Sequence, residues 1–186
     1  TWKDFQARNN NELVAVLGNF INRVFVLCHK YWDGVVPPKN ALEKVDVEVI
    51  EKLSFAPKEI GKYIEEYKFR FAINELINLA RAGNKYLADT EPWKLFKHDD
   101  SKKRTETILN IAIQITATLS IISEPFMPFT SQKLMQMIGS DFKKWTAAGN
   151  VELIKTGHTL NKPSLLFSII EDDEIQSQIV KLKSKK

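Results

Sequence analysis

Apolar residues recur every three or four positions over long stretches of this chain, and this spacing limits the folds open to it. The clearest runs occupy positions 13, 17, 20, 24, 27 and 31, and later positions 108, 112, 115, 119 and 122. Side chains three and four positions apart share one face of an α-helix, whereas strand residues alternate every second position. The pattern predicts long amphipathic helices that each bury one face against a neighbour.

Helix-breaking and capping residues set the expected boundaries. Asn9, Asn10 and Asn11 offer an N-cap for the first helix, Ala56-Pro57 marks a new start, and Gly139 ends a later helix. The predicted helices cover about residues 11–32, 39–52, 57–88, 103–123, 129–138 and 171–183, with a short helix beginning at Pro92. Between them, Leu165-Leu166-Phe167 is expected as an extended segment docked on the helices. Short connections imply antiparallel neighbours, so we expect an all-α antiparallel helical bundle.

The composition supports one helical domain and excludes several classes of site. The chain has 186 residues, 44% of them hydrophobic, with 27 Lys and Arg against 23 Asp and Glu. This length is sufficient for a packed core, and the small net charge of +4 does not by itself indicate nucleic-acid binding. Only seven glycines occur and none are adjacent, so no glycine-rich phosphate loop can be assembled.

Two features bear on the cellular setting. The single cysteine, Cys28, excludes a disulfide framework and is consistent with a reducing compartment, so we expect a cytoplasmic protein. Polar residues interrupt the apolar stretches, so no membrane-spanning helix and no membrane partner are expected. The chain begins Thr1-Trp2-Lys3-Asp4, without Met or a signal-peptide pattern, which suggests a piece of a longer protein.

Catalytic patterns are missing from the sequence. The three histidines, His29, His98 and His158, are far apart, and neither HExxH nor a helical ExxH pair is present. Cys28 lies next to His29 on a predicted helix, where neighbouring side chains point apart. We therefore expect no catalytic residue, no metal site and no cofactor in this chain, with Cys28 as a small buried residue.

Asn19 and Arg23 lie four residues apart on the first predicted helix, and therefore on one face. An amide beside a guanidinium offers planar donors and one acceptor, which are the groups needed to bind the edge of a nucleobase. The alternative is a structural hydrogen bond between helices, and the spacing alone does not separate the two interpretations.

Pro92 and Trp93 begin the predicted short helix. If Trp93 is exposed, its rigid indole is a platform on which an unpaired base can stack. If it is buried, it is a packing residue between helices. Nearby Lys94 and Lys97 add positive charge, but neighbouring carboxylates offset it, so we expect a modest electrostatic site.

Three groups of residues together resemble the anticodon-binding domain of bacterial methionyl-tRNA synthetases, which are class I aminoacyl-tRNA synthetases. They are Asn19-Phe20-Ile21-Asn22-Arg23, then Asn84-Lys85-Tyr86-Leu87 followed by Glu91-Pro92-Trp93-Lys94, and the closing segment Leu165 to Glu171. The family pattern places an N-x-x-x-R helix about seventy residues before an N-[KR]-Y-[ILV]-x-x-x-x-P-W segment. The resemblance covers nearly the whole chain.

The resemblance implies a role for each matching residue. Trp93, supported by Pro92, would stack on an anticodon base of tRNA(Met), and Asn19 and Arg23 would bind base edges of the CAU triplet. Asn22, Lys94 and Lys97 are possible supporting residues. The domains implied are a segment at 1–10 arriving from a preceding catalytic domain, an anticodon-binding bundle at 11–170, and a C-terminal helix with a basic tail at 171–186.

The family's HIGH-type and KMSKS-type signatures are not in this chain. The resemblance therefore implies that another part of the parent enzyme activates methionine with ATP and Mg²⁺. Two alternatives remain at this point. One is the equivalent domain of another class I synthetase, for valine, isoleucine, leucine or cysteine. The other is a helical protein-interaction scaffold with no role in nucleic-acid binding.

Overall fold

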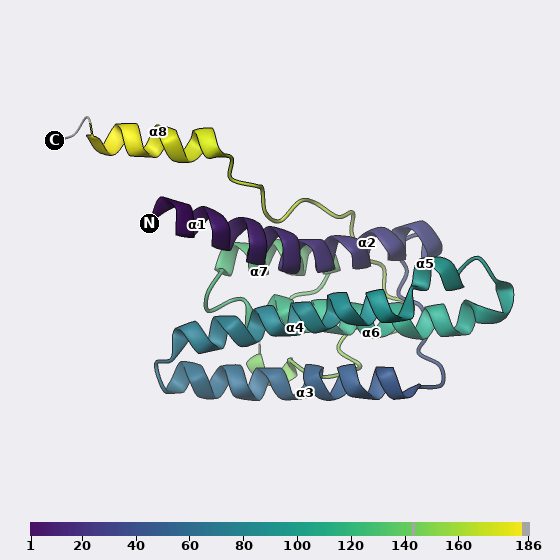
Figure 1. Ribbon diagram of the computed structural model, residues 1–186. Helices are drawn as coiled ribbons and strands as arrows, with labels where there is room; N and C mark the ends of the chain where they lie inside the picture. Colours follow the sequence, from purple (N-terminus) through teal and green to yellow (C-terminus); the bar gives the residue numbers. More distant parts are fainter. Residues whose placement is uncertain (143, 184–186) are drawn as a thin grey trace.

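The computed structural model, which describes residues 1–142 and 144–183, is a bundle of helices (Figure 1). Helices α3 (Lys44–Glu65) and α4 (Phe69–Thr90) form an antiparallel pair. Helix α6 (Lys102–Ile122) lies at the centre and is buried from residue 107 onward. It contacts α3, α4, α2 (Asn19–Trp32) and α7 (Pro128–Ile138). The predicted all-α antiparallel bundle is confirmed.

The N-terminal helix is longer than the apolar spacing predicts. Helix α1 (Trp2–Arg8), a π-helix (Asn9–Gly18) and α2 (Asn19–Trp32) follow one another without a break. The Thr1 hydroxyl accepts a hydrogen bond from the Asp4 N–H at 3.1 Å and caps the start, so the predicted start near residue 11 is wrong. The π-helix has wider turns than an α-helix, and it ends directly before Asn19.

The predicted helix boundary at Pro57 is also wrong. Pro57 lies inside α3, and the break falls at residues 66–68, where Tyr67 adopts a left-handed conformation with φ 58°. A proline within a helix cannot donate to the carbonyl four residues earlier, here Leu53. The backbone of Gly149 approaches the Leu53 carbonyl, and the proline ring is buried against this neighbour. Tertiary packing thus accommodates a residue that usually begins or ends a helix.

A row of polar side chains on α6 holds the irregular segments onto the bundle. The Asn110 amide donates to the Pro37 carbonyl at 2.8 Å. Gln114 bonds both the N–H and the carbonyl of Ile154, at 2.9 and 2.8 Å. These buried amides satisfy backbone groups that have no partner in a helix or sheet. They explain why an otherwise apolar central helix carries polar residues at helical spacing.

The remaining predicted elements are confirmed within a residue or two. They are α5 (Pro92–Leu95), α7 (Pro128–Ile138) and α8 (Asp172–Lys183). Gly139 ends α7 with φ 75°, a conformation that favours glycine. Leu165-Leu166-Phe167 is extended, and Leu166 and Phe167 pack against the core. Residues 184–186, the end of the predicted basic tail, lie outside the described residues.

Within the described ranges, two helical stretches are long and apolar enough to cross a membrane by length and composition alone. They are Trp2–Trp32 and Asp99–Ile122. This corrects the expectation that polar residues interrupt every apolar run too early. In the second stretch, 94% of the apolar window is buried inside the bundle, as in the core helix of a folded domain. In the first, Leu17, Phe20 and Val24 belong to the same buried core.

Candidate nucleic-acid interface

Asn19, Arg23 and Asn84 meet where α2 packs against α4. The Asn19 amide donates to the Asn84 Oδ1 at 3.2 Å, and a guanidinium nitrogen of Arg23 donates to the same oxygen at 3.5 Å. Asn84 in turn donates to the Val16 carbonyl at 2.9 Å, which fixes the orientation of its amide. Asn19 and Arg23 therefore lie on one face of α2, and the contact through Asn84 is the hydrogen bond between helices that the alternative interpretation of this pair predicts.

The close approach of the two helices depends on Gly83. A Cβ added at this position would lie 2.5 Å from the ring of Phe20, which is fully buried. A glycine here lets the α4 backbone lie against the Phe20 ring. Asn84, the next residue, is thereby brought within hydrogen-bond distance of Asn19.

Arg23 also contacts Trp93. The guanidinium carbon lies 5.0 Å from the centre of the indole ring, within the range of a cation–π interaction. Partial burial lowers the pKa of Arg23 below its ordinary value, yet an arginine at this depth keeps its charge. Within residues 1–142 and 144–183, no carboxylate forms an ion pair with Arg23. The site therefore holds a positive charge beside an amide and an aromatic ring, without a carboxylate partner among the described residues.

Local packing fixes the position of Trp93. Glu91 joins α4 to α5 in a left-handed conformation with φ 44°, and the buried Pro92 then begins α5. One turn later, the Phe96 ring stacks on Tyr31 of α2 at 3.9 Å between ring centres. Trp93 is half-buried and packs against the core. It is thus neither the fully exposed platform nor the fully buried packing residue that the two sequence-based interpretations require.

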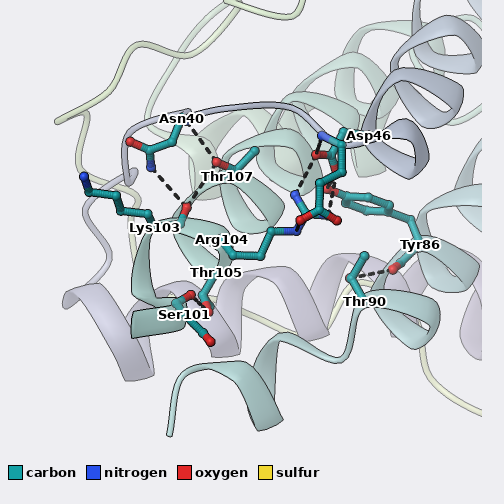
Figure 2. Close-up of polar contacts among 10 residues, drawn as sticks. Asn40, Asp46, Tyr86, Thr90, Ser101, Lys103, Arg104, Thr105 and Thr107 are labelled. Carbon is teal, nitrogen blue, oxygen red and sulfur yellow. Dashed lines mark hydrogen bonds and ion pairs between the residues drawn. The ribbon is translucent and has the colours of Figure 1, made fainter. Parts of the chain in front are cut away.

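A buried ion pair holds the opposite side of α4 (Figure 2). Asp46 is fully buried and accepts two hydrogen bonds from Arg104, at 2.6 and 2.9 Å, and one from the Tyr86 hydroxyl at 2.6 Å. Burial alone would raise the pKa of Asp46, but the hydrogen bonds from Arg104, the Glu43 backbone and Tyr86 outweigh it and lower the pKa. The network joins α3, α4 and α6. Because Tyr86 follows Asn84 by two residues, it points away from the interface and fixes the rotation of α4.

The other predicted site residues take different positions. Pro92 is buried, Lys94 pairs with Glu91 at 2.8 Å, and Lys97 is exposed. Asn22 is exposed and lines a groove that Asn19 also borders, but it makes no hydrogen bond to Asn19 or Arg23 in the described part of the chain. Asn84 was missed as a site residue, although it begins the segment that carries the family resemblance. Its neighbour Gly83, in the middle of a helix, is the sequence signal that marks the close contact.

Groups suited to catalysis or metal binding are not assembled around this interface. Cys28 is buried, and burial raises the pKa of its thiol to about 12, so it remains protonated at neutral pH. The His29 and His158 rings each hydrogen-bond a backbone carbonyl, of Asn161 and Ile138 respectively. In the part of the chain that the structure describes, no group of three or more His, Cys, Asp or Glu side chains could hold a metal ion.

Solved structures establish the fold independently. The apo form of Mycobacterium tuberculosis methionyl-tRNA synthetase superposes with a TM-score of 0.83. The match covers 89% of this chain and 34% of that chain, at 22% sequence identity. The same enzyme bound to methionyl-adenylate gives a TM-score of 0.81 over 87% of this chain. At this identity the likeness concerns the architecture of the bundle alone.

Sequence comparison gives the family. The sequence pattern of the anticodon-binding domain of methionyl tRNA ligase matches residues 36–186. Methionine–tRNA ligase of Phocaeicola vulgatus is 53% identical over the whole chain, and that of Cytophaga hutchinsonii is 52% identical. The chain spans 27% of the length of each of these relatives. On these grounds the chain belongs to the anticodon-binding domain family of methionyl-tRNA ligases.

Proposed function

We propose that this chain recognises the CAU anticodon of tRNA(Met) through Trp93, Arg23, Asn19 and Asn84. The observation that carries the proposal is the charged Arg23 side chain, held on Trp93 and Asn84 without a carboxylate partner in the described part of the chain. A partly buried cation that lacks an anionic partner is costly unless a ligand supplies one. An RNA loop supplies phosphates and base-edge acceptors together.

The roles follow from the contacts within the site. One face of Trp93 contacts Arg23, and an anticodon base stacks on the exposed remainder of the ring. The Arg23 fork donates to acceptor atoms of a base edge, because its planar donors match such edges in pairs. Asn19 gives its donor to Asn84 and offers its own carbonyl oxygen to a base amino group.

The lysines around α5 contribute attraction without base selectivity. Lys97 is exposed, and Lys94 is exposed but shares its charge with Glu91. Contacts of this kind bind phosphates and weaken as salt rises. Binding of mismatched anticodons should therefore depend on these lysines as strongly as binding of CAU does.

The parent protein, in this proposal, is a methionine–tRNA ligase in which a different domain activates methionine with ATP and Mg²⁺. The chain packs against that catalytic domain and has no adenylate-forming activity of its own. Methionine-dependent exchange of pyrophosphate into ATP, measured with this chain alone, should remain at background. Exchange above background from pure protein would contradict this assignment.

The test of anticodon recognition is Arg23→Lys, which keeps the charge and removes the planar fork. Affinity should be measured for a CAU stem-loop and for three stem-loops that each change one anticodon base, at two salt concentrations. The variant should lose about 1–3 kcal/mol of discrimination against at least one wrong base. Equal weakening of all four stem-loops would contradict direct base contact by Arg23 and indicate a phosphate contact.

A further inference from the structure

A groove of about 410 Å³ lies beside Asn19, and its lining includes no residue of α4. One wall is the N-terminal helix, from Val14 to Asn22, and the other is the extended segment 164–167, which runs along that helix in Figure 1. Asn19 lines this groove and also donates to Asn84. The groove is therefore continuous with the candidate interface.

Packing and hydrogen bonds hold both walls of the groove in place. Gly18 has no Cβ, and a Cβ there would lie 3.3 Å from the Phe167 ring, so the ring packs onto the helix backbone. The Lys133 ammonium donates to the Leu165 carbonyl at 2.7 Å, and the Asn9 amide donates to the Ser168 carbonyl at 2.9 Å. The extended segment is thus anchored on both sides of the groove.

The lining has the chemistry of a nucleobase site. The half-buried Leu166 and Phe167 supply apolar contact surface, and the exposed Asn22 amide has no hydrogen-bond partner among the described residues. Among the described residues that line the groove, none has a charged side chain. Four other surface hollows each include at least one carboxylate in their lining, from Glu59, Glu124, Asp141 or Glu51. Carboxylates repel a polyanion, so this groove is the hollow among these that suits RNA.

We propose that this groove binds one unpaired base of the same RNA loop, from a nucleotide next to the CAU triplet. This inference rests on the proposed function, because Asn19 places the groove beside the anticodon site. The Asn22 amide bonds the edge of the base, and Phe167 and Leu166 contact its face. Lys133, which forms no ion pair with a carboxylate in the described ranges, adds positive charge at the wall. Asn22 thus acts on a different nucleotide from Asn19 and Arg23.

The experiment combines abasic nucleotides with variants of the groove. Stem-loops carry CAU and one abasic nucleotide at each unpaired flanking position in turn, and their affinities are measured with the unaltered protein. One position should lose at least about fivefold in affinity when its base is removed. Asn22→Ala removes the amide, and Ala15→Leu places an added side chain in the groove from an exposed position. In both variants, removal of the same base should lower the affinity by less than about twofold.

Two control variants distinguish a failure of the groove proposal from a failure of the proposed function. Phe55→Ala alters an exposed aromatic residue in the hollow between α3 and α4, and it should leave every abasic penalty unchanged. Trp93→Ala tests the anticodon site on the same set of RNAs. One outcome is that Trp93→Ala weakens binding while the loss of affinity caused by each abasic nucleotide is the same in the Asn22→Ala and Ala15→Leu variants as in the unaltered protein. In that case the groove proposal is wrong and the proposed function stands. If the CAU stem-loop does not bind at all, or Trp93→Ala has no effect, both proposals are wrong.

Discussion

The guanidinium of Arg23 lies over the ring of Trp93, with 5.0 Å between its central carbon and the ring centre. The two residues are seventy positions apart in the sequence and come from α2 and α5. Their contact requires that α5 begin at Pro92 and that Phe96 stack on Tyr31. The placement of the short helix α5 against α2 therefore determines whether the charge of Arg23 and the aromatic face of Trp93 act together.

Removal of the indole is the most direct test of this pair. Trp93→Ala should weaken binding of a CAU stem-loop by about 1–3 kcal/mol, and Trp93→Phe should keep part of the affinity because a smaller ring remains. Thermal unfolding should be measured on the same proteins. Since Trp93 is half-buried, its loss should cost less stability than the about 3–5 kcal/mol typical of a core tryptophan. A core-sized loss of stability with unchanged affinity would identify Trp93 as a packing residue only.

Asn84 can be tested by a change of charge without a change of shape. Asn84→Asp places a carboxylate beside Arg23, which would neutralise the guanidinium and repel RNA phosphates. We expect affinity for the CAU stem-loop to fall by about 1–3 kcal/mol. Asn78→Asp is the matched control, because it adds the same charge to an exposed position of α4. Equal losses in the two variants would mean that only net charge matters.

Alanine substitutions at two helical glycines, Gly83 and Gly61, should have opposite effects on stability. Gly83→Ala would place a Cβ 2.5 Å from the buried Phe20 ring, so we expect a loss of about 1–3 kcal/mol in the free energy of unfolding and weaker stem-loop binding. A Cβ at Gly61 would meet the Trp145 ring at an ordinary contact distance of 3.6 Å, so Gly61→Ala should stabilise the fold by about 0.4–1 kcal/mol. Urea unfolding of both variants checks this. Stabilisation by Gly83→Ala would contradict the close helix contact.

Asp46 should make stability depend on acid pH. Its pKa is lower in the folded protein than the ordinary value of about 3.9, so the ionised carboxylate favours the folded state. This contribution is complete above the ordinary pKa and is lost as pH falls through the lowered folded pKa. Asp46→Asn should remove that dependence and cost about 3–5 kcal/mol, because Arg104 loses its charged partner. Denaturant midpoints between neutral pH and pH 2 measure both effects.

The matched control for Asp46 is Asp89, which forms a solvent-exposed pair with Lys85. Asp89→Asn should change stability by less than about 1 kcal/mol, as is usual for exposed ion pairs. A similar acid dependence in the Asp46→Asn variant and the unaltered protein would show that other carboxylates control acid unfolding.

The sequence predicts most helices because their apolar faces repeat regularly, as in α6 and α7. It misplaces the break between α3 and α4 because proline usually ends a helix, whereas here the packing of Gly149 accommodates Pro57. The change in apolar register after Tyr67 is the feature that marks the true break. It also misses the helical turns before Asn9, which lack a repeating apolar face and begin at a cap on Thr1.

The candidate site is also predictable only in part, because some of its contacts join distant segments of the chain. Asn19 and Arg23 share a helix, so their proximity follows from spacing alone. The position of Asn84 depends on how closely α2 and α4 approach, which is decided by the fit of Gly83 to Phe20. The groove beside Asn22 depends on where the extended segment 164–167 packs along the helix. Contacts between distant segments of this kind leave no periodic signal in a single sequence.

The buried ion pair between Asp46 and Arg104 has a consequence for binding kinetics. It prevents α4 from turning about its axis, so Asn84 already faces its neighbours before any ligand arrives. A site that is preformed in this way needs no slow rearrangement of the protein, and association can follow a single step. In the proposed complex, the RNA loop is then the partner that unstacks its bases and changes shape.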